Sequence, residues 1–197
     1  MPYLKEVVDQ INLELKEDVF SYAPFITKFN GISELIPQKE GDKDTSFPAL
    51  YDSDGNGEFT GIDDRYNLTV YHRCLGRSYA KEESNFGDNN DNYTETNQML
   101  LVVWAERESL RLTKEEIQDK LILGLPTNLT SQFSYDYDGV NSVQIAANEI
   151  NTDSKSVWSQ EFTGYDYKLS TSQVLFALTY SVEIKYRKSC ISVCKEC

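Results

Sequence analysis

Hydrophobic residues occupy every second position of a stretch near the C-terminus, from Ser172 to Arg187. The alternating residues are Val174, Phe176, Leu178, Tyr180, Val182, Ile184 and Tyr186. The residues between them change along the stretch from apolar, through hydroxyl-bearing, to charged. Such alternation predicts a long β-strand whose first half lies on a core and whose second half reaches solvent. We expect it to be the central strand of an antiparallel sheet.

Two other stretches repeat apolar residues at the three- and four-residue spacing of amphipathic helices. The first runs from Leu4 to about Phe20. The second begins at Thr113, where Glu116 three residues later completes a capping box, and ends near Gly124.

Shorter apolar or alternating runs predict the remaining strands. These runs are Phe47–Tyr51, Asn67–Cys74, Met99–Ala105, Val143–Ile150 and Val157–Phe162. We expect an apolar connector from Phe25 to Pro37 and a polar loop from Gln38 to Ser46. This order predicts one α+β domain over residues 1–197, with the N-terminal helix and the mid-chain helix packed on one face of a mostly antiparallel β-sheet.

A long polar segment, Gly76–Asn97, separates two of the predicted strands. It is rich in Asn, Asp, Glu and Ser, and it far exceeds the roughly two to five residues of a usual hairpin connection. We expect an acidic hairpin loop that projects from the sheet as an interaction arm. Its aromatic residues Tyr79, Phe86 and Tyr93 are the expected anchors at an interface with a neighbouring subunit or ring.

The chain is strongly acidic, since 32 Asp and Glu against 19 Lys and Arg give a net charge of −13. This balance disfavours binding to phosphate backbones, which depends on clustered Lys and Arg. An acidic wall that repels DNA is compatible with a conduit through which DNA slides. No apolar run of about 18 residues predicts a membrane span, and Met1–Glu6 lacks the pattern of a signal peptide. We therefore expect maturation in a cytoplasm and no membrane partner.

One segment has the spacing of a calcium-binding loop. Asp52, Asp54, Asn56 and Asp63 stand at its first, third, fifth and twelfth positions. Strand-like runs flank the segment where a calcium hand has helices, which favours a Gly-rich hairpin turn instead. A calcium site and a turn both remain open.

The C-terminal segment 188–197 is rich in cysteine. Cys190, Cys194 and Cys197 could hold three positions of a structural zinc, with Cys74 or His72 as the fourth ligand if their strand neighbours the last one. The alternative is a terminus that carries free thiols.

No catalytic signature is present, and we expect neither an enzyme nor a cofactor. Glu183 and Lys185 match the E-x-K of metal-dependent nucleases, but no Pro-Asp partner precedes them. His72 is the only histidine, and alternation places it on the same face as Leu68 and Val70. A hydrogen-bonded structural histidine is therefore the favoured interpretation.

The order of these elements resembles that of ring-forming neck and tail proteins of tailed bacteriophages, of the tail-completion or terminator type. The segments that carry the resemblance are Leu4–Phe20, Phe47–Tyr51, Thr113–Gly124, Val157–Phe162, Gly164–Leu169 and Ser172–Tyr186. The chain also resembles virion proteins of crAss-like phages. The acidic segment Gly76–Asn97 and the cysteine-rich C-terminus depart from the pattern.

The resemblance implies a structural virion protein that forms a homo-oligomeric ring in the head-to-tail connector or tail. Such rings stack below the portal and contact adjacent connector, portal and tail proteins, and a hairpin loop reaches the next ring. Their β-sheets line the passage for double-stranded DNA during genome ejection, without sequence-specific binding. The resemblance also implies assembly in the host bacterial cytoplasm. The alternative function is a binding module stabilised by calcium or zinc.

Overall fold

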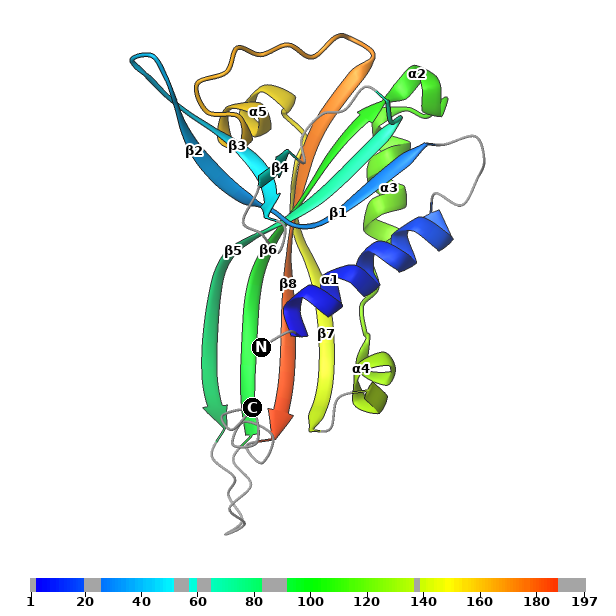
Figure 1. The fold of residues 1–197 in the computed structure, drawn as a ribbon. Helices are drawn as coiled ribbons and strands as arrows, with labels where there is room; N and C mark the ends of the chain where they lie inside the picture. The colour runs from blue at the N-terminus through cyan, green and yellow to red at the C-terminus, as the bar shows by residue number, and fades with distance from the viewer. Residues whose placement is uncertain are drawn as a thin grey trace.

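The computed structural model describes residues 3–19, 26–51, 57–59, 65–82, 92–136 and 139–187. In this part of the chain the fold is α+β, as predicted (Figure 1). Its centre is a five-stranded sheet in which three strands are 15 residues long. Helices cover one face of that sheet, and a shorter helix and a small second sheet lie at the upper end of the molecule in Figure 1.

The large sheet has the strand order β1-β5-β6-β8-β7. Its strands are β1 (Thr27–Ile32), β5 (Leu68–Glu82), β6 (Asn92–Glu106), β7 (Val140–Asn151) and β8 (Gln173–Arg187). β1 pairs with β5 in parallel, and the other three pairs are antiparallel. β8 is an interior strand as expected, but β6 and not β8 lies in the middle of the order.

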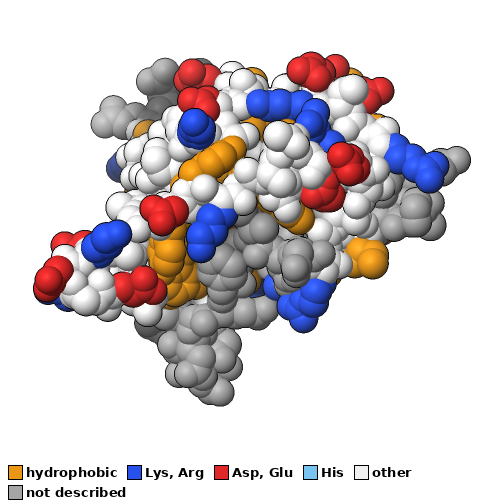
Figure 2. Space-filling model, turned by 90° about the horizontal axis from the view of Figure 1, so that it is seen from above, with side chains coloured by type: hydrophobic (Ala, Val, Ile, Leu, Met, Phe, Trp, Pro, Cys, Tyr) orange, Lys and Arg blue, Asp and Glu red, His pale blue; other side chains and the backbone are white. Residues whose placement is uncertain are grey.

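The small sheet contains β2 (Glu34–Glu40), β3 (Lys43–Tyr51) and β4 (Gly57–Phe59), with β3 between the other two. The hairpin of β2 and β3 projects from the body of the molecule (Figure 1). Figure 2 looks down on this end and shows acidic and basic side chains mixed on the projecting arm, with hydrophobic side chains exposed at its base.

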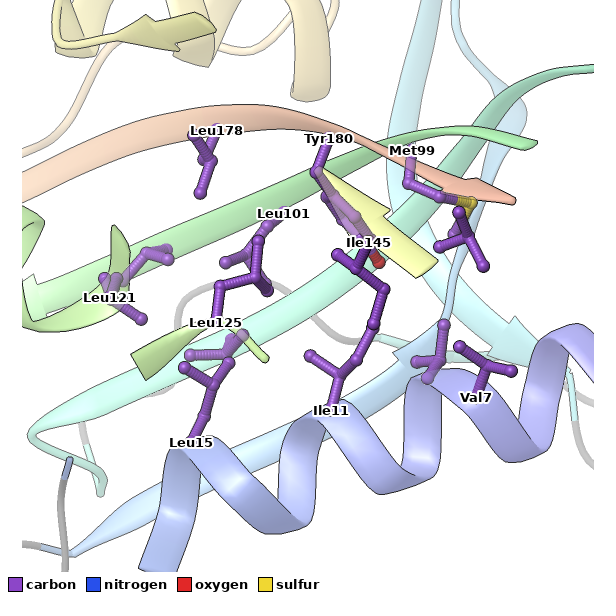
Figure 3. Packing of buried hydrophobic residues seen from close by; sticks show 14 of the residues in the cluster. Val7, Ile11, Leu15, Met99, Leu101, Leu121, Leu125, Ile145, Leu178 and Tyr180 are labelled. Carbon is purple, nitrogen blue, oxygen red and sulfur yellow. The ribbon is translucent and has the colours of Figure 1, made fainter. Parts of the chain in front are cut away.

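The helical side of the large sheet holds the main core. Its helices are α1 (Tyr3–Glu14), continued by a π-helical turn at Leu15–Val19, then α2 (Arg107–Leu110), α3 (Lys114–Gly124) and α4 (Thr130–Asp136). Val7, Ile11 and Leu15 point from α1 toward strand residues such as Leu101 and Tyr180 (Figure 3). Because α1 and α3 bury their apolar residues in one cluster, the prediction that both helices pack on one face is confirmed.

The opposite face of the sheet carries a smaller core at the upper end only. The helix α5 (Ser154–Glu161) packs Val157 and Trp158 onto Tyr71, Trp104 and Leu175 of the sheet. The prediction of a strand at Val157–Phe162 is therefore wrong. Asp153 accepts a hydrogen bond from the backbone N of Lys155 (3.0 Å) and so caps the helix at its start.

The capping box of α3 is formed as predicted. Thr113 Oγ1 accepts from the backbone N of Glu116 (3.1 Å), and Glu116 Oε2 accepts from the backbone N of Thr113 (2.7 Å). The expected connector and loop between residues 25 and 46 are wrong, because this segment contains β1, β2 and the start of β3. Pro37 lies in β2 at the edge of its sheet, where the missing N–H costs no ladder bond.

The predicted loop Gly76–Asn97 is too long at both ends. β5 continues to Glu82 and β6 begins at Asn92, so both flanks of the segment are paired strand. The connection itself, residues 83–91, lies outside the described residues. A bulge between Cys74 and Gly76 interrupts the alternation of β5 and hides its continuation in the sequence.

Burial along β8 follows the prediction on one face only, because the other face stays on the main core along the whole strand. From Val174 to Leu178 the side chains on both faces are buried, and from Thr179 onward only every second one is. The change occurs where α5 ends its cover of the second face, since Leu175 and Ala177 belong to the small core.

A matched pair of glycines tests how α5 is held near the arm. At Gly164 (φ 81°) an added Cβ would lie 2.8 Å from the backbone O of Asp44, whereas at Gly41 (φ 63°) it would meet nothing within 4 Å. We expect Gly41→Ala to cost about 1 kcal/mol of unfolding free energy from backbone strain alone. Gly164→Ala should cost roughly 2–4 kcal/mol, because overpacking adds to the strain. Equal midpoints of the two variants in urea denaturation would contradict this account.

Candidate interaction surface

The lower half of the large sheet in Figure 1 extends beyond α5 and the small sheet. We call it the distal sheet, and it comprises residues 76–82 of β5, 92–98 of β6, 140–147 of β7 and 179–187 of β8. Its two faces differ. One continues the main core under the helices, and we call the other the open face.

The open face consists mainly of uncharged side chains that are small or polar. Alternation in the ladder places these residues on it: Ser78, Ala80, Thr96, Gln98, Gln144, Ala146, Thr179, Ser181, Glu183 and Lys185. Ser78, Gln98 and Gln144 are exposed, on three different strands. The charges of Glu183 and Lys185 face each other, with Nζ 3.6 Å from Oε1. The open face is thus polar, and its charged residues Glu183 and Lys185 are paired.

The helix side of the distal sheet contains a buried polar cluster. Arg77 Nε lies 3.1 Å from Glu95 Oε1 and donates to Asn97 Oδ1 (2.9 Å), while Asn97 Nδ2 donates to Glu95 Oε1 (2.9 Å). The Glu95 side chain is only 3% exposed. Each of the three side chains has a hydrogen-bond or ion-pair partner within the cluster, and these partners offset the cost of burying the Glu95 carboxylate. These residues lie in the segment that the sequence interpretation assigned to a loop.

Aromatic rings lie beside this cluster. Tyr93 stacks on Tyr186, with ring centroids 6.2 Å apart, and burial, followed by the charge of Glu95, raises the pKa of Tyr186 to about 12. Tyr79 is 51% exposed and near Arg77 (Nη1 to OH 3.4 Å). Of the three predicted interface residues, Tyr79 is thus exposed and Tyr93 is half-buried against its own chain. Phe86 lies outside the described residues.

His72 is fully buried at the junction of α1, β1, β5 and β8. Its Nδ1 lies 2.7 Å from Tyr180 OH, and its Nε2 lies 2.8 Å from Asn12 Oδ1. Asn12 Nδ2 donates to the backbone O of Asn30 (2.9 Å), so Asn12 Oδ1 is an acceptor and Nε2 carries the imidazole hydrogen. Nδ1 then accepts from the hydroxyl of Tyr180. This network confirms the structural interpretation of His72.

The placement of His72 bears on its candidacy as a zinc ligand. Both ring nitrogens are hydrogen-bonded, and β6 lies between β5 and β8, so the strand of His72 and Cys74 does not neighbour the last one. Cys74 is exposed. Cys190, Cys194 and Cys197 lie outside the described residues, as do the calcium candidates Asp52, Asp54, Asn56 and Asp63. Within the described ranges no three His, Cys, Asp or Glu residues cluster as metal ligands.

A second buried cluster joins α5 to the sheet. Glu161 Oε1 accepts from Arg73 Nη1 (2.6 Å), and Glu161 Oε2 accepts from Tyr71 OH (3.0 Å). Burial raises the pKa of Glu161, and the charge of Arg73 opposes that rise. The contacts of Glu161 with Arg73 and Tyr71 therefore hold α5 against β5. They lie at the upper limit of the open face.

A cavity of about 510 Å³ lies on the far side of α5, toward the base of the arm. Aromatic side chains dominate its lining, with Phe47, Trp158, Phe162 and Tyr165 around it and Asp166 and Lys168 among the polar groups. Trp158 Nε1 donates to the backbone O of Tyr165 (3.1 Å), which holds the wall in place. The sequence interpretation missed this cavity because it assigned α5 to a strand.

Comparison with models of known protein families gives no match, and comparison with curated proteins gives none either. In the described part of the chain, no helix has the length and apolar character needed to cross a membrane.

Sequence reasoning missed the partners of the buried polar residues. Asn12 follows Ile11 on the buried side of an otherwise apolar helix face, and this polar interruption is a signal for a buried hydrogen bond. Glu95 and Asn97 alternate with Met99 and Leu101 in one strand, and that period of two would have extended β6 had polar residues been allowed in the core.

Protonation of His72 should destabilise the fold. Burial lowers the pKa of His72 from 6.5 to about 3, so its contribution is complete above pH 6.5 and is lost as the pH falls toward 3. Each pH unit in that window should cost about 1.4 kcal/mol. We expect the unfolding free energy of wild type to fall more steeply than that of His72→Gln between about pH 6 and 4. Carboxylates contribute equally to both proteins, so parallel curves would contradict the assignment.

Proposed function

We propose that this chain is a structural virion protein that forms a ring in the head-to-tail connector or tail of a tailed bacteriophage, of the tail-completion type. In this proposal the open face lines the DNA passage, and the helices lie on the outside of the ring. The observation that supports it best is the open face itself: a broad β-sheet surface that no described helix covers beyond α5.

The chemistry of the open face suits passage of DNA. Binding to duplex DNA rests on Lys and Arg that displace counterions from phosphates. Glu183 and Lys185 of β8 are paired on this face, and its exposed side chains include Ser78, Gln98 and Gln144. In a chain of net charge −13 such a wall offers phosphates few attractive contacts, so DNA would slide past it.

The outline of the molecule suits contacts between subunits. The β2–β3 hairpin projects as a charged arm (Figures 1 and 2), and a two-stranded hairpin is marginally stable on its own. Contacts that join unlike surfaces of neighbouring subunits close into rings when the rotation permits. The arm provides one such surface for an adjacent subunit or ring protein.

The mass of the purified protein in solution provides the first test of the proposal. Sedimentation of the purified protein at micromolar concentration should reveal a closed oligomer, and electron micrographs should show rings with a central opening. A monomer that is also absent from purified virions would contradict the proposal.

A charge variant tests which face lines the opening. Ser78→Lys, Gln98→Lys and Gln144→Lys, combined in one chain, should make the ring retain linear duplex DNA, with a salt dependence that steepens by about 0.9 per phosphate contact. Closed circular DNA cannot thread a preformed ring and should not be retained. The control carries Leu13→Lys, Leu123→Lys and Ser131→Lys on the exposed helical surface. Equal retention by both variants, or of both DNA forms, would exclude the open face as the lining.

A further inference from the structure

The outer edge of β5 is long and largely unpaired. β1 pairs with β5 only from Leu68 to His72. From Arg73 to Glu82 no described strand lies on that side, while the other side stays paired with β6. An exposed edge of this length presents a row of backbone donors and acceptors to another strand.

The pairing register shows which backbone groups face outward. The backbone N of Glu106 donates to the O of Asn67 (2.9 Å), and the N of Ser33 donates to the O of His72 (2.7 Å). Odd-numbered residues of β5 therefore face β6 at first, and even-numbered ones face β1. The bulge between Cys74 and Gly76 reverses this order. Below it, Arg77, Tyr79 and Lys81 direct their backbone groups outward.

Three other outer strands of the described chain carry protecting contacts or a proline, and the fourth, β4, is only three residues long. At β7, the O of Val143 accepts from Leu129 N (2.9 Å) and the N of Ile145 donates to Thr127 O (3.0 Å). At β1, Asn12 of α1 donates to the O of Asn30. At β2, Pro37 lacks a donor. Proline and covering segments are two of the devices against edge pairing, and the described residues place neither at the edge of β5 below the bulge. Of the other devices, this edge carries the bulge and the basic residues Arg77 and Lys81.

The side chains along this edge also indicate a contact. Leu75 is 50% exposed and Tyr79 is 51% exposed, which is unusual for large apolar or aromatic residues on one strand. The charge of Arg77 is already balanced by Glu95 at 3.1 Å. A neighbouring strand could therefore approach without meeting an uncompensated cation at Arg77.

We propose that the outer edge of β5 pairs with the same edge of a second copy of this chain, antiparallel and about a two-fold axis at Tyr79. In this register Tyr79 lies opposite its own equivalent, and Arg77 lies opposite Lys81 of the other copy. Like charges in opposed positions are unfavourable, and the ion pair of Arg77 with Glu95 reduces that cost. All three outward residues of each copy then exchange backbone hydrogen bonds. The two sheets become one continuous sheet.

A second copy fits because the edge complements itself. Among the described outer edges of another molecule, those of β1, β2 and β7 are partly covered or lack a donor, and β4 is only three residues long, so the edge of β5 is the longest one on offer. A two-fold contact cannot be repeated around a cyclic ring. It therefore joins either two free molecules or two rings back to back, and it is independent of whether a ring closes.

Two proline substitutions test the pairing, one at a residue whose backbone N–H points outward and one at a residue whose N–H points toward β6. Tyr79→Pro removes an outward donor and should halve the mass measured by sedimentation without a large change in melting temperature. Ala80→Pro removes a donor that faces Thr94 of β6 and should lower the melting temperature. Tyr79→Val keeps the donor and a good strand former, and it should retain the wild-type mass.

Disulfide trapping tests the register and does not depend on a proline variant that folds. In a background with the native cysteines changed to serine, Tyr79→Cys should form a cross-linked dimer with diamide, because directly opposed residues of a hydrogen-bonded pair have Cα atoms about 5.5 Å apart. Ala80→Cys is the control and should cross-link poorly, since Ala80 lies opposite Ser78 of the other copy.

The outcomes separate this contact from the proposed ring. A dimer that cross-links through Tyr79→Cys supports the edge contact even if no ring forms. A ring whose mass is unchanged by Tyr79→Pro and which does not cross-link through Tyr79→Cys overturns the edge contact and leaves the ring in place. A wild-type monomer at micromolar concentration overturns the edge contact, whereas the ring is contradicted only if the protein is also absent from purified virions.

Discussion

The antiparallel ladder between β6 and β8 sets the arrangement of every other element. Each residue from Asn92 to Glu106 has a partner between Arg187 and Gln173, without a bulge. Because side chains alternate between faces, a slip of one residue would turn the apolar side of one of the two strands outward. The neighbouring strands β5 and β7 carry the irregularities instead, with bulges that let them bend around this ladder. The register of β6 against β8 therefore determines where the main core, the smaller core under α5 and the open face lie.

Buried polar groups fix how the other elements attach to that ladder. The hydrogen bonds of His72 connect α1 to β8 across β5, and Glu161 ties α5 to β5 through Arg73 and Tyr71. Apolar contacts alone would tolerate small shifts of a helix along a sheet, whereas a buried donor without its acceptor costs about 1–3 kcal/mol. Each cluster therefore favours one position of its helix. The same logic allows Glu95 and Asn97 to stay in the sheet, since Arg77 is present to pair with them.

The elements that could be predicted from the sequence are those whose buried residues are apolar and recur at the spacing of a helix or a strand. The strand β8 and the helices α1 and α3 belong to this group, and so does the inward position of His72. The helix α5 was missed because its eight residues offer little more than two turns of pattern, and Trp158 and Phe162 favour strands on propensity. The lower parts of β5 and β6 were missed because their buried residues are polar, and β1 and β2 were missed because few of their side chains are buried. In the candidate surface, Tyr79 was identified but Arg77, Glu95 and the open face were not, since each depends on partners distant in sequence.

The two unusual surfaces of the distal sheet have a common origin. A three-stranded stretch of 15-residue strands is longer than the helices that cover it, so part of the sheet must face solvent or another molecule. On the open face the chain places mainly uncharged side chains that are small or polar, which tolerate water and attract neither apolar nor phosphate groups strongly. At the edge of β5 it leaves backbone groups and the side chains of Leu75 and Tyr79 exposed, although it protects the edges of β2 and β7. The open face thus offers few groups for binding, whereas the edge of β5 beside it offers backbone donors and acceptors and two exposed side chains. This combination is compatible with the two proposals, in which the open face borders a passage and the edge contacts a second copy.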